Sequence, residues 1–168
     1  WNAAAAKGTP DLIALQWANN ETGIIQPLHF LHDYPDTSFH CDAVQGFGKL
    51  PLQPDALRAD ALVLSGHKFC APKGVGVLRI SEMAPIHAVL GGGGQQNGMR
   101  PGTESPALAT AFALALELAL KEQKEYADNG HRCQKAFLNA LQKKTARFQE
   151  NHSKKGLPNT LNLTFSGI

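Results

Sequence analysis

Short apolar runs separated by turn residues dominate the first half of the chain. Residues 11–17, 37–42, 59–65 and 75–80 are rich in leucine, isoleucine, valine, alanine and phenylalanine, and turns with glycine, proline or polar residues lie between them. Runs this short are typical of strands that are buried on both faces of a sheet, and residues 28–34 have the spacing of a connecting helix. The pattern predicts an α/β sheet whose strands are mostly parallel.

The second half of the chain has a helical pattern. Residues 106–120 consist mainly of alanine and leucine, which are strong helix formers, and Ser105 is in position to cap the first turn. The apolar circumference of this segment predicts burial on most sides. Gly130 is expected to end the helical pattern, residues 131–148 to form a second, amphipathic helix, and residues 160–165 to form a strand.

A domain boundary is expected where charge density rises after the alanine-rich segment. The rise begins near residue 121 and extends to residue 130, which divides the chain into residues 1–123 and 124–168. The chain starts without methionine and stops directly after a predicted strand, so we expect it to be a part of a longer protein.

Composition excludes several classes of protein. Hydrophobic residues make up 43% of the 168 residues and charged residues 18%, which is typical of a globular chain. Sixteen lysines and arginines against fourteen acids give a net charge of +2, too small to favour nucleic acid or an anionic membrane. No apolar stretch reaches the roughly 20 residues of a membrane span, and no signal peptide is visible, so the cytoplasm is the expected compartment.

The three cysteines, Cys41, Cys70 and Cys133, show no metal-binding or disulfide pattern. They are an odd number and lack CxxC or Cys/His spacing, which argues against a zinc site and a disulfide framework. Each is expected to be a buried small hydrophobic residue rather than a nucleophile.

Polar side chains follow three of the predicted strands. The clusters are residues 19–23 (Asn-Asn-Glu-Thr-Gly), 41–45 (Cys-Asp-Ala-Val-Gln) and 65–68 (Ser-Gly-His-Lys). Because ligands of open α/β sheets bind beyond the carboxyl ends of the strands, the three clusters are expected to converge. Together they supply an amine, a carboxylate, amides and phosphate donors, which is the set of groups that pyridoxal 5'-phosphate requires.

Longer motifs around these clusters resemble those of a known family. They are Ala-Asn-Asn-Glu-Thr-Gly, His-Cys-Asp-Ala-Val-Gln-Gly, Ser-Gly-His-Lys-Phe-Cys-Ala-Pro-Lys-Gly and Arg-Pro-Gly-Thr-Glu. In these motifs, from about Leu12 to Phe165, the chain resembles the cysteine desulfurases of the class V aminotransferase family, in the branch that serves iron–sulfur cluster assembly. The resemblance implies a fold-type I pyridoxal phosphate enzyme, with residues 1–123 in the large domain and residues 124–168 beginning the small one.

The resemblance also implies a role for each site residue. Lys68 matches the catalytic lysine that holds the cofactor as a Schiff base, and Asp42 matches the partner of the pyridinium nitrogen. The remaining cofactor-binding residues are Gln45 at the phenolic oxygen, Asn20 near the ring and substrate carboxylate, Ser65 and His67 at the phosphate, and Thr103, a phosphate ligand that the family supplies from the neighbouring subunit. From the residues alone, Asp42 and Asn20 could instead cap turns, and His67 could be a packed histidine.

The same resemblance implies the reaction and its partners. The substrate is L-cysteine, the product is L-alanine, the sulfur passes to an acceptor or scaffold protein, and the enzyme is a homodimer. In the family, the imidazole that stacks on the cofactor lies upstream of this chain, and the persulfide-forming cysteine and substrate-binding arginine lie downstream, so residues 1–168 alone are expected to be inactive. Two alternatives stay open: another class V enzyme, such as an aminotransferase or a selenocysteine lyase, and a non-catalytic remnant.

Overall fold

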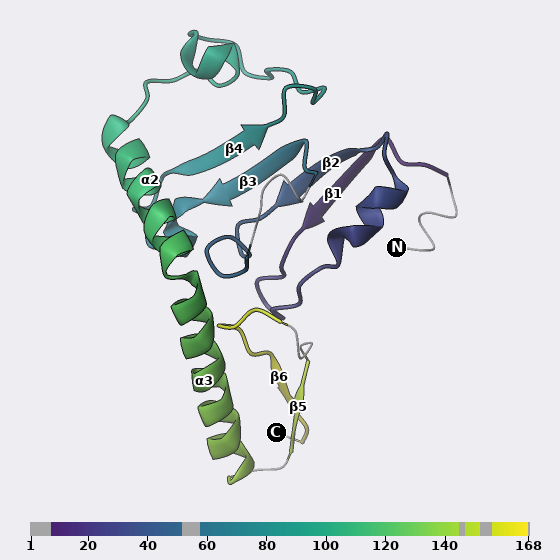
Figure 1. Ribbon diagram of the computed structural model, residues 1–168, viewed down its shortest axis with the longest axis vertical. Helices are drawn as coiled ribbons and strands as arrows, with labels where there is room; N and C mark the ends of the chain where they lie inside the picture. The colour runs from purple at the N-terminus through teal and green to yellow at the C-terminus, as the bar shows by residue number, and fades with distance from the viewer. Residues whose placement is uncertain (1–7, 52–57, 145–146, 152–155, 168) are drawn as a thin grey trace.

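A four-stranded mixed sheet forms the centre of the molecule, a computed structural model that describes residues 8–51, 58–144, 147–151 and 156–167. The strands lie in the order β1-β2-β3-β4 (Figure 1); the first three are parallel and β4 is antiparallel to β3. Their bounds are Leu12–Gln16 for β1, Ser38–Asp42 for β2, Ala61–Ser65 for β3 and Gly76–Ile80 for β4. All four predicted strands are therefore present, each within two residues of its expected start.

The other elements surround or extend this sheet. In the described residues they include the short 3-10 helices η1 (Leu28–Asp33), η3 (Gly66–Phe69) and η4 (Gln95–Gly98) and the long helices α2 (Pro106–Lys121) and α3 (Gln123–Gln142). A separate antiparallel pair, β5 (Phe148–Glu150) and β6 (Leu163–Phe165), lies beside α3 at the end of the molecule that carries the C-terminus (Figure 1). The segment between β1 and β2 is helical as predicted, with 3-10 rather than α geometry.

The sheet register brings the carboxyl ends of β1, β2 and β3 to one edge. Gln16 pairs with Asp42, and Asp42 pairs with Val63, two residues before the end of β3. The chain then leaves each strand at this edge, with the Trp17 amide bonded to the Asp42 carbonyl at 2.8 Å and the Ala43 amide to the Val63 carbonyl at 3.1 Å. The three polar clusters of the sequence follow directly from these ends.

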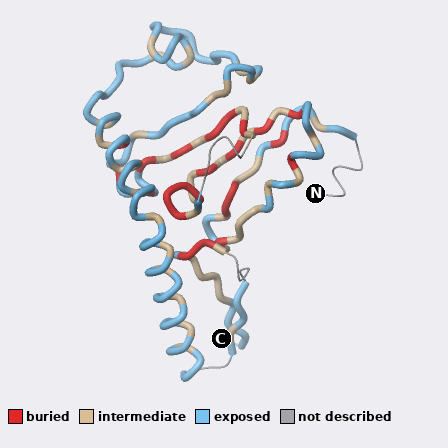
Figure 2. The backbone as a smooth tube through the Cα atoms, in the orientation of Figure 1, coloured by how far each residue is buried: buried red, intermediate tan, exposed pale blue. Residues whose placement is uncertain are grey.

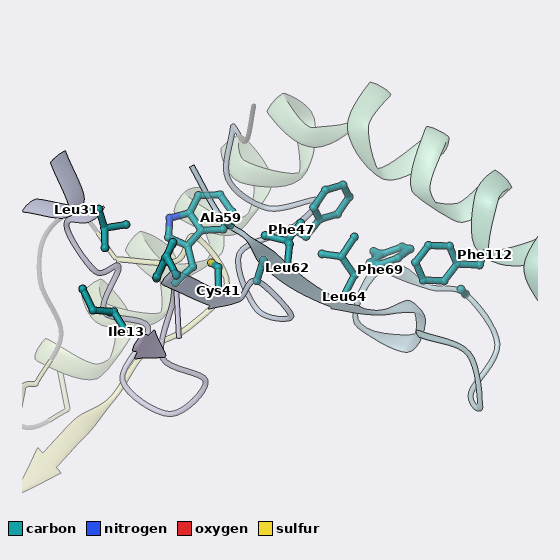
Figure 3. Packing of buried hydrophobic residues seen from close by; sticks show 13 residues of the cluster. Ile13, Leu31, Cys41, Phe47, Ala59, Leu62, Leu64, Phe69 and Phe112 are labelled. Carbon is teal, nitrogen blue, oxygen red and sulfur yellow. The ribbon is translucent and has the colours of Figure 1, made fainter. Parts of the chain in front are cut away.

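The hydrophobic core is centred on β2, β3 and the turn after β2, where Figure 2 shows buried backbone, and Phe112 of α2 belongs to it. Figure 3 shows a row of buried side chains that runs from Ile13 through Cys41 and Leu62 to Phe69 and Phe112. Burial alternates along β2, as expected when one face of a strand packs against the core. The prediction that the strands are buried on both faces is wrong for β2, which is buried on one face, and for the two edge strands, where Leu12 of β1 is 59% and Leu78 of β4 is 52% exposed.

Gly130 does not end a helix. The break falls at Glu122, whose backbone leaves helical geometry between α2 and α3, and α3 continues through Gly130 to Gln142. A Cβ at position 130 would overlap the backbone carbonyl of Pro158, so the glycine allows a segment distant in sequence to pack against the helix. The predicted helix 131–148 is wrong at its start and at its end, because Phe148 lies in β5.

Helix α2 begins as predicted but is less buried than predicted. The Ser105 hydroxyl accepts a hydrogen bond from the Leu108 amide at 3.4 Å, which confirms the N-cap. Of the helix residues only Phe112 is buried, whereas Leu114 is 57% and Leu118 43% exposed. The described part of the chain covers one side of α2, so the alanine and leucine residues of the opposite side face outward. No helix of the described residues is long and apolar enough to cross a membrane.

The turn after β2 depends on close contact between Gly46 and Trp17. A Cβ at position 46 would overlap the indole ring, which is itself buried. We expect Gly46→Ala to lower the free energy of unfolding by ~1–3 kcal/mol, the usual cost of overpacking a core. Urea unfolding of the full-length protein measures this loss. Gly94→Ala is the matched control, because a Cβ there meets nothing within 4 Å, and an equal loss in both variants would contradict the packing argument.

Candidate functional site

The candidate site is built on the edge of the sheet where β2 and β3 end. Asp42 is the last residue of β2, and Ser65 the last of β3. His67 and Lys68 follow on η3, a single 3-10 turn in which both side chains are exposed while Gly66 and Phe69 are buried. The short turn therefore presents the imidazole and the amine outward.

Aromatic packing fixes the position of η3. The ring of Phe69 lies between those of Phe47 and Phe112, at centroid distances of 5.8 and 5.1 Å (Figure 3). Gly66 is required at the start of the turn, because a Cβ there would come within 2.9 Å of both Ala71 and Phe112. Residues of the hydrophobic core therefore hold His67 and Lys68 in place.

Ser65 and His67 form a pair of hydrogen-bonding groups. The Ser65 Oγ and His67 Nδ1 atoms lie 3.0 Å apart, a distance at which either can donate to the other. In both arrangements one donor stays free to point away from the pair, either the Ser65 hydroxyl or the His67 Nε2–H. The exposure of His67 removes the alternative that it is a packed histidine.

Asp42 has one engaged and one free oxygen. Its Oδ1 accepts a hydrogen bond from the Val44 amide at 3.0 Å, so the carboxylate does cap the turn after β2. Within the described residues no donor reaches Oδ2. Asp42 is half-buried, and capping leaves its second oxygen available to a ligand.

Asn19, rather than Asn20, caps the turn after β1. Asn19 Oδ1 accepts hydrogen bonds from the Glu21 amide at 2.9 Å and the Thr22 amide at 2.8 Å. Asn20 is exposed, and among the described residues its Oδ1 accepts one long hydrogen bond, from Gln16 at 3.5 Å. The turn therefore does not need the Asn20 side chain.

Lys49 is hydrogen-bonded to Gln45 and lines the same cavity as Lys68. Gln45 Oε1 accepts a hydrogen bond from Lys49 Nζ at 3.0 Å, and Lys49 is 7% exposed. Lys49 and Lys68 both line a cavity of about 280 Å³, together with Phe69, Ala115 and Tyr126. Burial lowers the pKa of Lys49, and the charge of Lys68 lowers it further, which reflects the proximity of the two amines.

Thr103 and Lys49 are the two residues at which the structure and the predicted site still have to be compared. Thr103 lies in the exposed loop before α2, and within the described part of the chain no hydrogen bond links its side chain to the other predicted site residues. Lys49 was not among the predicted site residues. The signal in the sequence was its place four residues after Gln45, a spacing at which the two side chains can meet. Its burial could not be foreseen, because it depends on packing against η3 and α2.

The cysteines differ in their surroundings. Cys41 is buried as predicted, whereas the prediction is wrong for Cys70 and Cys133, which are exposed. Burial, with a smaller effect of the Asp42 charge, raises the pKa of Cys41 to about 12. Since the thiolate is the reactive form, Cys41 stays protonated and unreactive at pH 8.

We therefore expect iodoacetamide at pH 8 to alkylate Cys70 and Cys133 of the native protein and to leave Cys41 unmodified. Mass spectrometry of tryptic peptides measures the three sites separately. A denatured sample provides the control in which all three react, and equally fast labelling of Cys41 in the native protein would contradict its burial.

The chain is similar to known proteins in both sequence and fold. Residues 3–168 match the family described as aminotransferase class-V. The chain is 36% identical over 161 residues to the cysteine desulfurase IscS of Dictyoglomus turgidum and 36% identical over 165 residues to a cysteine desulfurase of Sinorhizobium fredii. These alignments cover 94% of this chain but only 41% and 42% of the two relatives. A solved NifS-like protein superimposes with a TM-score of 0.87 at 33% identity, over 95% of this chain and 45% of that one.

Proposed function

The chain belongs to the aminotransferase class-V family and has the α/β fold of fold-type I pyridoxal phosphate enzymes, and we propose that the protein containing it is a cysteine desulfurase. The observation that carries the proposal is the position of Lys68. Its exposed amine stands at the end of β3, beside the Ser65–His67 pair and one strand from Asp42. The chain spans about 40% of the length of the curated relatives, so the activity belongs to the whole protein.

The groups at this edge fit pyridoxal 5'-phosphate. The Lys68 amine has no hydrogen-bond acceptor among the described residues, and Asp42 keeps one free oxygen. The Ser65–His67 pair retains a free donor, and the amide nitrogen of Gln45 is not occupied by its bond to Lys49. An amine, a carboxylate, an amide donor and a hydroxyl–imidazole pair match the aldehyde, the ring nitrogen, the phenolic oxygen and the phosphate of the cofactor.

Each side chain then has a defined task. When bound, the cofactor supplies an electron sink for the charge that develops at the substrate Cα. Lys68 would hold the cofactor through its amine, and the same amine would accept the Cα proton of the substrate. The Asp42 carboxylate would offset the charge of the protonated ring nitrogen, Asn20 would lie near the substrate carboxylate, and Ser65 with His67 would hold the phosphate.

The proposed reaction converts L-cysteine and an acceptor thiol into L-alanine and a persulfide of that thiol. The substrate C–S bond breaks, the acceptor sulfur forms the new S–S bond, and one proton reaches the carbon that becomes the methyl group. In this proposal the accepting cysteine lies beyond residue 168, and iron–sulfur cluster assembly is the destination of the sulfur. A sulfur-acceptor or scaffold protein is therefore the expected partner.

The proposal includes a homodimer in the cytoplasm. Thr103 supports the dimer, because it is exposed and forms no hydrogen bond in the described part of its own chain, as expected for a residue that serves the neighbouring subunit's phosphate site. The break at Glu122 and the separate β5–β6 pair support a division between residues 1–123 and 124–168.

The test uses the full-length protein with pyridoxal phosphate, L-cysteine and a thiol reductant. We expect equal amounts of L-alanine and sulfide. Transfer of the amino group to a 2-oxo acid without sulfide release would favour the aminotransferase alternative, and turnover of L-selenocysteine alone would favour a lyase. A protein that binds no cofactor would favour the non-catalytic remnant.

A further inference from the structure

Lys49 is a buried cation without a described counter-ion. It is 7% exposed, and within the described residues no carboxylate lies within 4.0 Å of its ammonium. Its described hydrogen bond runs to the neutral oxygen of Gln45, and the charge that acts on its pKa is that of another lysine, Lys68. Burying an unpaired charge is costly, and an apolar side chain of similar size would fill the same space at lower cost. Packing alone therefore does not account for a lysine at this position.

The hydrogen bond decides which way the Gln45 amide points. An ammonium group only donates, so it selects the oxygen of the amide and not the nitrogen. With Oε1 held at 3.0 Å from Lys49 Nζ, the NH₂ group of Gln45 points away from Lys49. Without the lysine, the two ends of the amide could exchange by rotation.

We propose that Lys49 is a positioning residue that holds the Gln45 side chain with its NH₂ group directed to the phenolic oxygen of pyridoxal phosphate. The inference rests on the proposed function, because it assigns Gln45 to that oxygen. Lys49 is distinct from the attachment lysine, since its own amine is buried and hydrogen-bonded, while Lys68 is exposed and has no hydrogen-bond acceptor among the described residues.

A double-mutant cycle on the full-length holoenzyme tests the link between the two residues. The variants are Lys49→Met, Gln45→Ala and the pair, and the measurement is the rate at which each releases pyridoxal phosphate into cofactor-free buffer with a trapping reagent. We expect Lys49→Met to raise this rate about tenfold, the effect of one lost hydrogen bond to a charged group. In the Gln45→Ala background the same substitution should change the rate less than about twofold.

Two further measurements separate positioning from general stability. The circular dichroism of the bound cofactor should change in Lys49→Met, because the ring loses a fixed contact, and should return in Lys49→Arg, which restores a donor. Lys121→Met, an exposed site in the last turn of α2, is the control and should leave the release rate unchanged. Urea unfolding of the apoproteins checks that each variant is folded.

If Lys49→Met raised the cofactor release rate by the same factor in the wild-type and Gln45→Ala backgrounds, the inference would be overturned, because Lys49 would then act without Gln45. An unchanged release rate and dichroism in Lys49→Met would also overturn it. A wild-type protein that binds no pyridoxal phosphate would overturn the proposed function first, and that result is distinguishable from the others because it is obtained without any variant.

Discussion

Lys68→Arg is expected to abolish desulfurase activity of the full-length protein while leaving its fold intact. Arginine keeps the positive charge at the exposed end of η3, but its guanidinium stays protonated and cannot bind the cofactor aldehyde or accept the Cα proton. Because both tasks depend on the same amine, we expect L-alanine formation to fall by about a thousandfold or more.

The matched control for this substitution is Lys73→Arg, which changes an exposed lysine five positions along the chain outside η3. Its rate should equal that of the wild type. Alanine formation by Lys68→Arg within tenfold of wild type would show that another lysine supplies the amine, and the assignment of the site would be wrong.

Asp42→Asn is expected to separate cofactor binding from catalysis. The amide can still accept the Val44 amide hydrogen bond that the carboxylate accepts now, so the turn after β2 should be preserved. It cannot offset the charge of a protonated ring nitrogen, and the nitrogen would lose its proton. We expect the variant to retain cofactor and to lose about a hundredfold to a thousandfold in kcat, as when a preorganised electrostatic group is removed.

Cofactor content by absorbance and L-alanine formation under saturating L-cysteine measure the two effects separately. Asp36→Asn, in the exposed turn before β2, removes a carboxylate without touching the site and should match the wild type. A near wild-type kcat in Asp42→Asn would show that a different group protonates the ring.

The strands and their edge were predictable from local sequence. Each apolar run is bounded by turn residues, and parallel strands place their carboxyl ends together, so the sequence pattern is sufficient to assign Asp42 and Ser65 to one edge. Ser105 as an N-cap was predictable for the same reason, because capping depends on neighbours along the chain.

Features that depend on distant contacts were not predictable. Gly130 has the sequence signature of a helix end, but its role is to admit the Pro158 carbonyl, 28 residues further on. In the sequence Lys49 looks like a surface lysine, but it is buried because the turn after β2 packs against η3 and α2. Cys70 looks like a core residue, but it is exposed at the end of η3. The sequence does not show which of Asn19 and Asn20 caps the turn, because either asparagine could do so. The backbone geometry of the folded turn selects Asn19.

The central claim is that Lys68 carries the cofactor, and covalent trapping tests it most directly. The full-length protein is incubated with pyridoxal phosphate, reduced with borohydride, digested and mapped by mass spectrometry. The structure predicts one modified peptide with the cofactor on Lys68, whose amine is exposed and free, and none on the buried Lys49. A cofactor adduct on Lys49 or Lys73, with Lys68 unmodified, would contradict the account.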